Sequence, residues 1–234
     1  MSRRALLLGA TGLVGGLLLR RLLADPAWST ITVIGRRTPP WCDQLPISSQ
    51  EKLHLLTTDF ATLTEHQDEF AVDDVFCCLG TTLKKAGSRT AFARVDRDYC
   101  LAAATMAKQA GAGRFIMVSA VNANPRGLSF YARVKGEAEQ RIAALALPTT
   151  VFMQPSLLRG ERDEQRLAEG VGVAALGLAM PLVAWTGASW LPIDAQTVAD
   201  AMLAVALNGP ASGVHRLRYR QMQHWAGQLP SLVE

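Results

Sequence analysis

The sequence predicts an α/β protein in which a doubly wound parallel sheet carries helices on both faces. Strand-like and helix-like segments alternate over about the first two-thirds of the chain, which is the order that right-handed βαβ units require. A glycine-rich turn at residues 9–15 joins the first strand-like segment to the first helical one. The chain has 234 residues, 49% of them hydrophobic, and is therefore long enough to bury the core of one large domain.

Short apolar or β-branched runs mark the expected strands, at residues 4–8, 30–34, 53–57, 74–79, 114–119 and 149–153. Helical stretches are expected at residues 13–23, 89–110 and 129–147. Gly111 and Gly113 stop the second of these helices, and Pro148 ends the third. Beyond Pro155 the alternation weakens to a helix at 195–206 and a strand at 214–218.

The whole chain, residues 1–234, is expected to form a single domain in which residues 156–193 contribute a small, substrate-facing C-terminal cap. Residues 170–193 carry no charged side chain and are long enough to span a bilayer. Four glycines and two prolines interrupt this stretch, which favours a buried or lid-like segment. Peripheral membrane attachment through it is a weaker hypothesis.

Charge and cysteine content narrow the class of protein. The net charge of +4 suits an anionic ligand but is too small and too scattered for nucleic acid. The four cysteines form no C-x-x-C pair, and the four histidines are scattered, so no metal site is expected. The cysteines are interpreted as small buried apolar residues in a reducing, cytoplasmic compartment.

The turn at residues 9–15 has the pattern G-x-x-G-x-x-G, with Gly9, Gly12 and Gly15 between a strand and a helix. The first glycine permits the tight turn, the second lets the backbone approach a pyrophosphate, and the third lets helix and strand pack closely. The N-terminus of the helix then offers N–H groups to the phosphates. This context predicts a dinucleotide site.

The end of the second strand indicates which nicotinamide cofactor is preferred. An acidic residue there would accept a hydrogen bond from the 2′-hydroxyl of NAD(H). Gly35, Arg36 and Arg37 stand at this place instead, and two guanidinium groups can bind a 2′-phosphate. The sequence therefore favours NADP(H) over NAD(H), although a pair of solvated surface arginines is the alternative.

Three residues form a candidate catalytic set. Tyr131 and Lys135 are spaced i and i+4, which places them on one face of a helix. The Lys135 cation would stabilise a tyrosinate, so that Tyr131 could act as a general acid toward a carbonyl oxygen. Ser119 ends the fifth strand, and its hydroxyl could orient the same oxygen.

Four motifs stand in order along the chain: the glycine turn, FCCLGTT at residues 76–82, VDRDY at residues 95–99 and VKGE at residues 134–137. Together they resemble the Tat-interacting-protein family of NADPH-binding, atypical short-chain dehydrogenase/reductases and its bacterial members. The resemblance covers most of the chain and is weakest at residues 40–50 and after Gly209.

The resemblance implies a Rossmann-type fold, NADPH binding and a catalytic triad of Ser119, Tyr131 and Lys135. It also implies that Asp59 lies near the adenine and that residues 79–81 pass over the sugar and phosphates. The candidate cofactor-binding residues are Gly9, Thr11, Gly12, Leu13, Val14, Gly15, Arg36, Arg37, Asp59, Phe60, Leu79, Gly80, Thr81, Lys135 and Pro155.

The sequence departs from the family pattern at Asp96, where short-chain dehydrogenases commonly carry an asparagine that holds a proton-relay water. Two functions therefore stay open. The first is an NADPH-dependent oxidoreductase that acts on a small carbonyl compound, and the second is a catalytically weak NADPH-binding sensor that acts through a protein partner. A homodimer is compatible with either.

Overall fold

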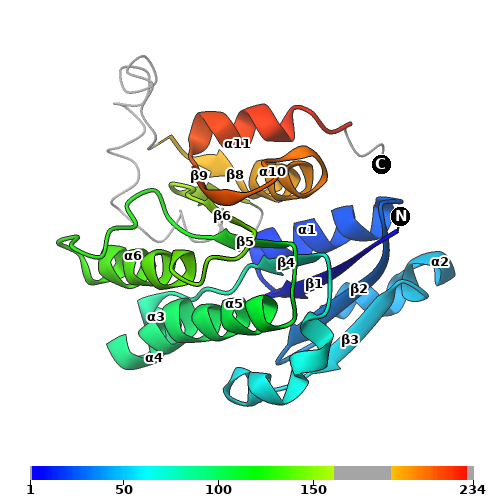
Figure 1. The fold of residues 1–234 in the computed structure, drawn as a ribbon, viewed down its shortest axis with the longest axis horizontal. Coiled ribbons are helices and arrows are strands. Elements are labelled where there is room, and N and C mark those ends of the chain that lie inside the picture. Colours follow the sequence, from blue (N-terminus) through cyan, green and yellow to red (C-terminus); the bar gives the residue numbers. More distant parts are fainter. Residues whose placement is uncertain (1, 161–190, 231–234) are drawn as a thin grey trace.

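A seven-stranded, entirely parallel sheet forms the centre of the computed structural model, which describes residues 2–160 and 191–230 (Figure 1). The strand order is β3-β2-β1-β4-β5-β6-β9. The strands are β1 (Arg3–Leu8), β2 (Trp28–Gly35), β3 (Leu53–Thr57), β4 (Asp74–Cys77), β5 (Arg114–Val118), β6 (Thr149–Met153) and β9 (Gly213–Leu217). Two short strands, β7 (Leu158–Arg159) and β8 (Ile193–Asp194), pair separately.

Helices cover both faces of the sheet, as the doubly wound class requires (Figure 1). One face carries α1 (Leu13–Ala24), α10 (Ala195–Asn208) and α11 (Tyr219–Ala226), and the other carries the 3-10 segment η2 (Phe60–Phe70), α5 (Cys100–Gln109) and α6 (Phe130–Ala143). The remaining elements are η1 (Pro40–Gln44), α2 (Ile47–Gln50), α3 (Leu83–Ala86), α4 (Arg89–Ala93) and η3 (Arg94–Tyr99).

The apolar side chains of the strands divide between two cores, one on each face. Leu7 and Phe76 belong to the core under α1 and α10, whereas Leu6 and Val75 belong to the core under α5 and α6. Burial on both faces explains why these strands read as continuous apolar runs in the sequence. It also separates Cys77, which is fully buried in the second core, from Cys78, which packs against the first.

The order of the strands places a crevice at the carboxyl ends of β1 and β4. From β1 the chain moves outward to β2 and β3 and then returns to the other side of β1 at β4. The connections that follow β1 and β4 therefore run in opposite directions. The gap between two such strands is the topological switch point, where ligands bind in doubly wound sheets. The glycine turn follows β1 and residues 79–81 follow β4.

The structure confirms the predicted α/β class, while several elements differ from their expected bounds; the helix expected at 129–147, for example, ends at Ala143. The helix expected at 89–110 contains a π-helical turn, η3, and the strand expected at 74–79 ends at Cys77. Helix α11 was not predicted, because its eight residues are too few to show a repeated helical pattern of apolar side chains. Most of the expected cap, and nearly all of the uncharged stretch at 170–193, lies outside the described residues.

Within residues 2–160 and 191–230, none of the helices combines the length and the apolar character that crossing a membrane requires.

Candidate active site

The glycine turn after β1 has no room for side chains at its two ends. Gly9 has a φ of +87°, and a Cβ there would lie 2.5 Å from the carbonyl oxygen of Cys78. A Cβ on Gly15 would lie 2.3 Å from the carbonyl oxygen of Gly9. Gly12 closes the turn by donating its N–H to Gly9 O at 2.9 Å. The three glycines therefore bring β1, β4 and α1 into direct backbone contact.

The N-terminus of α1 is available to an anion. Gly12 is the N-cap residue and provides no side-chain hydrogen bond to the first turn. At this end of the helix, Thr11 and Gly12 are exposed and Leu13 is partly exposed. Val14 is buried against the core. The free backbone N–H groups of an uncapped first turn bind phosphate oxygens. The turn at residues 9–15, here called the glycine cradle, thus fits the pyrophosphate of a dinucleotide.

The residues expected at the adenosine end lie at the carboxyl ends of β2 and β3. Arg36 and Arg37 directly follow β2 and are exposed. Asp59 is also exposed, and its Oδ1 accepts a hydrogen bond from Ala61 N at 3.0 Å, which caps η2. Phe60 is buried, with its ring centroid 5.7 Å from that of Tyr99.

Lys135 is held by an ion pair in the interior. Its Nζ lies 2.8 Å from Asp96 Oδ1, and the two side chains are 5% and 1% exposed. The second oxygen, Asp96 Oδ2, accepts a hydrogen bond from Thr81 N at 2.9 Å. A Cβ on Gly80 would lie 3.9 Å from Lys135 Nζ and 3.4 Å from Asp96 Oδ1. Asp96 therefore joins α6 to the loop that leaves β4.

The charge of Lys135 is stabilised despite its burial. Burial alone would lower the pKa of the ammonium, but the Asp96 carboxylate, together with Tyr131 and Cys100, raises the pKa of Lys135 above its ordinary value. Lys135 is consequently a cation throughout the physiological pH range. Asp96 balances that cation with a negative charge.

Tyr131 lies in the first turn of α6, which begins at the N-cap Ser129, whose side chain accepts a hydrogen bond from Ala132 N. Its side chain is 36% exposed, and its ring centroid is 5.8 Å from that of Phe92 on α4. The phenol is close enough to Lys135 to raise the pKa of that ammonium. The structure therefore brings these two predicted residues together.

Ser119, which the sequence predicts to orient a substrate oxygen, has a hydrogen-bond partner within the protein. Ser119 is 3% exposed, and its hydroxyl donates a hydrogen bond of 2.5 Å to Glu139 Oε1. Glu139 also accepts hydrogen bonds from Gln154 Nε2, at 2.9 and 3.2 Å, and from Arg216 Nε, at 2.8 Å. The proton of Ser119 thus points into a buried polar network, which connects β5, α6, β6 and β9.

Pro155, the last of the predicted cofactor residues, is buried where β6 ends. Its carbonyl oxygen accepts a hydrogen bond of 2.9 Å from Val121 N. Leu79, the first residue of the loop at 79–81, is also buried. Both residues shape the carboxyl edge of the sheet through their backbone.

Sequence reasoning did not find Glu139, Gln154 or Arg216. A signal for Glu139 was present, because it follows Lys135 by four residues and therefore shares a helix face with Tyr131 and Lys135. Gln154 and Arg216 carry no comparable local signal, since only the pairing of β6 with β9 brings them to α6.

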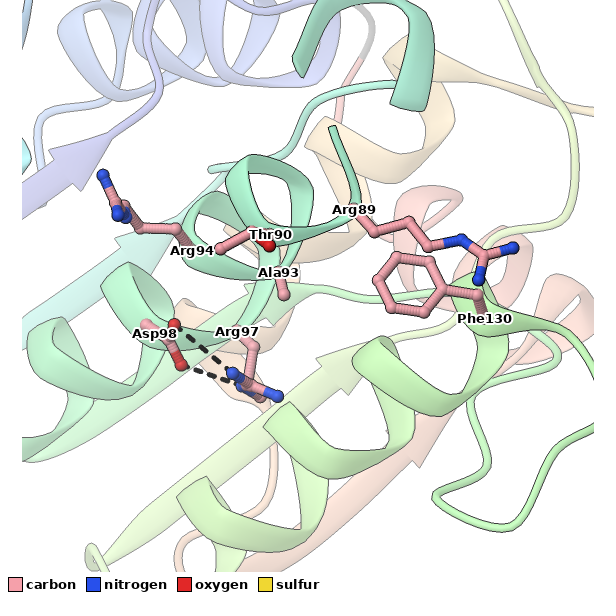
Figure 2. Close-up of a pocket in the computed structure, with 7 residues that line it drawn as sticks. All are labelled: Arg89, Thr90, Ala93, Arg94, Arg97, Asp98 and Phe130. Atoms are coloured by element: carbon pink, nitrogen blue, oxygen red, sulfur yellow. Dashed lines mark hydrogen bonds and ion pairs between the residues drawn. The ribbon is translucent and has the colours of Figure 1, made fainter. Parts of the chain in front are cut away.

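A pocket of about 330 Å³ lies against α4, η3 and the start of α6, and none of the predicted site residues lines it (Figure 2). Arg89 stacks over the ring of Phe130, with 5.4 Å between its Cζ and the ring centroid. Arg97 pairs with Asp98 at 2.8 Å, and Arg94 extends away from Phe130 (Figure 2). Phe92 connects the pocket to the site, because its ring contacts those of Phe130 and Tyr131.

Comparison with solved structures agrees with this architecture. An UDP-N-acetylglucosamine 4-epimerase from Methanobrevibacter ruminantium M1 superposes with a TM-score of 0.68 at 16% identity, covering 93% of this chain and 76% of that chain. The Bordetella bronchiseptica enzyme WbmG, in complex with NAD, gives a TM-score of 0.65 at 17% identity, covering 93% and 73% of the two chains. The fold and the glycine cradle define a Rossmann-type, short-chain dehydrogenase/reductase-like domain.

Sequence comparison then identifies the family. The chain belongs to the NAD(P)H-binding family, whose model matches residues 9–179, and the resemblance to the Tat-interacting-protein group within it is confirmed. Protein HTATIP2 of Rattus norvegicus is 34% identical over 213 residues, which is 91% of this chain and 84% of that protein. Protein FMP52, mitochondrial, of Candida albicans is 34% identical over 210 residues, which is 87% of each chain. A cytoplasmic location for the present chain stays a prediction.

Proposed function

We propose that the chain is an NADPH-dependent oxidoreductase that reduces a small carbonyl compound. One observation carries the proposal: Lys135 Nζ lies beside Gly80 of the loop that leaves β4, while Tyr131 stands one helical turn away on the same helix. This arrangement supports an acid and a cation at the carboxyl edge of the sheet, where a dinucleotide lying across the glycine cradle would present its nicotinamide.

The proposed reaction adds a hydride and a proton to the carbonyl group and yields an alcohol. Bound NADPH would supply the hydride to the carbonyl carbon. The Tyr131 phenol donates its proton to the carbonyl oxygen, and the nearby Lys135 cation stabilises the tyrosinate that remains. Because the Tyr131 side chain is 36% exposed, water can return the proton after each turnover.

The test is the Tyr131→Phe variant, which removes the phenolic proton and keeps the ring. NADPH binding, followed by fluorescence, should be retained, and oxidation of NADPH by aldehydes, ketones and quinones should be lost. Tyr219→Phe on α11 is the matched control, because Tyr219 Oη accepts a hydrogen bond from Gln223 far from this helix. Unchanged turnover in Tyr131→Phe would refute the proposed role of Tyr131.

The preference for NADP(H) over NAD(H) is part of the proposal. Among the described residues, neither Arg36 nor Arg37 has a hydrogen bond or ion pair to another group, which supports their availability to a 2′-phosphate. In Arg36→Ala/Arg37→Ala, the dissociation constant of NADPH should rise at least tenfold and that of NADH should stay within about twofold, since charge-assisted hydrogen bonds contribute about 1.5–3 kcal/mol each. Equal weakening of both cofactors would contradict this preference.

A second candidate function is a sensor that binds NADPH and acts through a protein partner. Two contacts favour it: Lys135 is already paired with Asp96, and Ser119 already donates to Glu139. Single-turnover oxidation of bound NADPH by the carbonyl and quinone panel separates the two functions. Oxidation by any compound supports the enzyme, whereas saturated NADPH binding with no oxidation favours the sensor.

A further inference from the structure

Asp96 occupies a position that the proposed chemistry has not used. It lies in the π-helical turn η3, is 1% exposed as a side chain, and uses both carboxylate oxygens. One oxygen pairs with Lys135 and the other accepts the N–H of Thr81. Short π-helical segments often occur at functional sites, because the extra residue in the turn redirects side chains. Here the turn carries a carboxylate between two elements of the candidate active site.

The groups around Lys135 determine the charge of the site. Asp96 faces its ammonium from η3, Tyr131 lies one turn earlier on its own helix, and Cys100 faces it from α5. The neighbouring Cys77 thiol of β4, together with burial, raises the pKa of the Cys100 thiol, and Cys100 Sγ donates a hydrogen bond to Val95 O at 3.5 Å. Cys100 is therefore neutral, and Asp96 is the one anion among the described groups facing Lys135.

We propose that Asp96 is a positioning residue that fixes Lys135 under the loop at Gly80–Thr81 and offsets part of its charge as seen by Tyr131. The inference deepens the proposed function and rests on it. In a site with an asparagine at position 96, the Lys135 cation would act on the phenol undiminished. In this chain the phenol shares its helix with an ion pair and not with a lone cation.

The consequence can be measured without turnover, by titrating the phenol of Tyr131. The chain has 3 tyrosines, so a Tyr99→Phe/Tyr219→Phe background leaves Tyr131 as the tyrosine that ionises in ultraviolet difference spectra. Asp96→Asn in this background should lower the titration midpoint by roughly one pH unit, the scale of the effect of a neighbouring charge. Lys135→Met should raise the midpoint, because it leaves the Asp96 anion unbalanced.

The double variant Asp96→Asn/Lys135→Met tests whether the two charges offset each other. It removes both members of the pair, so its midpoint should lie between those of the two single variants. Asp96→Glu, which keeps the carboxylate, should stay close to the background. The expected order of midpoints is therefore Asp96→Asn lowest, the background and the double variant in between, and Lys135→Met highest.

An unchanged titration midpoint in Asp96→Asn would overturn the inference. Loss of a purely structural carboxylate would lower the melting temperature without moving the titration of the phenol. If Asp96→Asn does not fold, the comparison of Lys135→Met with the double variant decides instead, and equal midpoints in these two proteins would reject the proposal. Failure of the proposed function has a separate signature, which is undiminished NADPH oxidation in Tyr131→Phe.

Discussion

The hydroxyl of Ser119 donates a 2.5 Å hydrogen bond to Glu139 Oε1, where both side chains are almost fully buried. Glu139 is in turn satisfied by Gln154 and Arg216. In the free protein Ser119 therefore joins β5 to α6, and its oxygen can offer only lone pairs to a ligand. This polarity supports the proposal that Tyr131, and not Ser119, donates the proton to a carbonyl oxygen.

We predict that Ser119→Ala lowers the free energy of unfolding by about 1–3 kcal/mol, because a buried hydrogen bond to a charged acceptor is lost. Chemical denaturation measures the change. Ser29→Ala is the control, since its exposed hydroxyl makes only a 3.5 Å contact to Arg3 O, and it should change stability by less than about 0.5 kcal/mol. Equal stability of the wild type and Ser119→Ala would mean that the hydroxyl does not point toward Glu139.

The third glycine of the cradle, Gly15, should reject a methyl group, whereas the next residue, Gly16, should tolerate one. Gly15→Ala would place Cβ 2.3 Å from Gly9 O, which forces α1 away from β1 and should weaken NADPH binding at least tenfold. Gly16→Ala places Cβ 3.3 Å from Ala10 O, so it should change stability by no more than about 1 kcal/mol. Fluorescence titration with NADPH compares the two variants. Equal affinities would contradict the packing role assigned to the third glycine.

The buried carboxylate at the opposite end of the sheet should make stability depend on pH. Burial raises the pKa of Asp74, although Arg3, Trp28 and Arg114 oppose this shift. A raised folded-state pKa gives a stabilising contribution that is complete below the unfolded-state value and is lost as pH rises through the folded-state value. The stability of the wild type relative to Asp74→Asn should therefore fall as the pH is raised from about 4 toward neutrality.

Denaturation at a series of pH values measures this difference for Asp74. Asp68→Asn, at an exposed position on η2, is the matched control and should show a nearly constant difference. A difference for Asp74→Asn that grows with pH would show that the Arg3 ion pair, at 2.5 Å, outweighs burial.

Removing one member of the buried pair of Asp96 and Lys135 should lower the free energy of unfolding more than removing both members. Lys135→Met leaves the Asp96 carboxylate without its cation and should lower the free energy of unfolding by about 3–5 kcal/mol. The double variant Asp96→Asn/Lys135→Met should recover a substantial part of that loss, because no isolated charge remains in the interior. A double-mutant cycle from urea denaturation gives the coupling, with the exposed Lys84→Met as control. Additive losses would contradict a direct interaction.

Local patterns in the sequence were sufficient for most of the sheet and for the glycine cradle. The strands at 53–57 and 149–153 have the predicted bounds, because apolar and β-branched runs that end at prolines or polar turns define them locally. The π-helical turn at Arg94–Tyr99 could not be predicted, because the 89–110 segment reads as one continuous helix.

The predicted catalytic residues also show which contacts local sequence patterns can predict and which they cannot. Tyr131 and Lys135 are neighbours through helical spacing alone, so the sequence places them correctly relative to each other. The partner of Ser119 is 20 residues away, on α6, and the partner of Lys135 lies on η3. Both contacts depend on how helices dock onto the sheet, which no local pattern encodes.

The polar network around Glu139 is completed by the strand that comes last in the seven-stranded sheet. Arg216 reaches Glu139 only after β9 has paired with β6. During synthesis on the ribosome, a nascent chain that lacks β9 therefore carries a buried carboxylate without its guanidinium. Premature termination before this strand would damage the interior next to Ser119 as well as the edge of the sheet, and so would expose incomplete chains to cellular quality control.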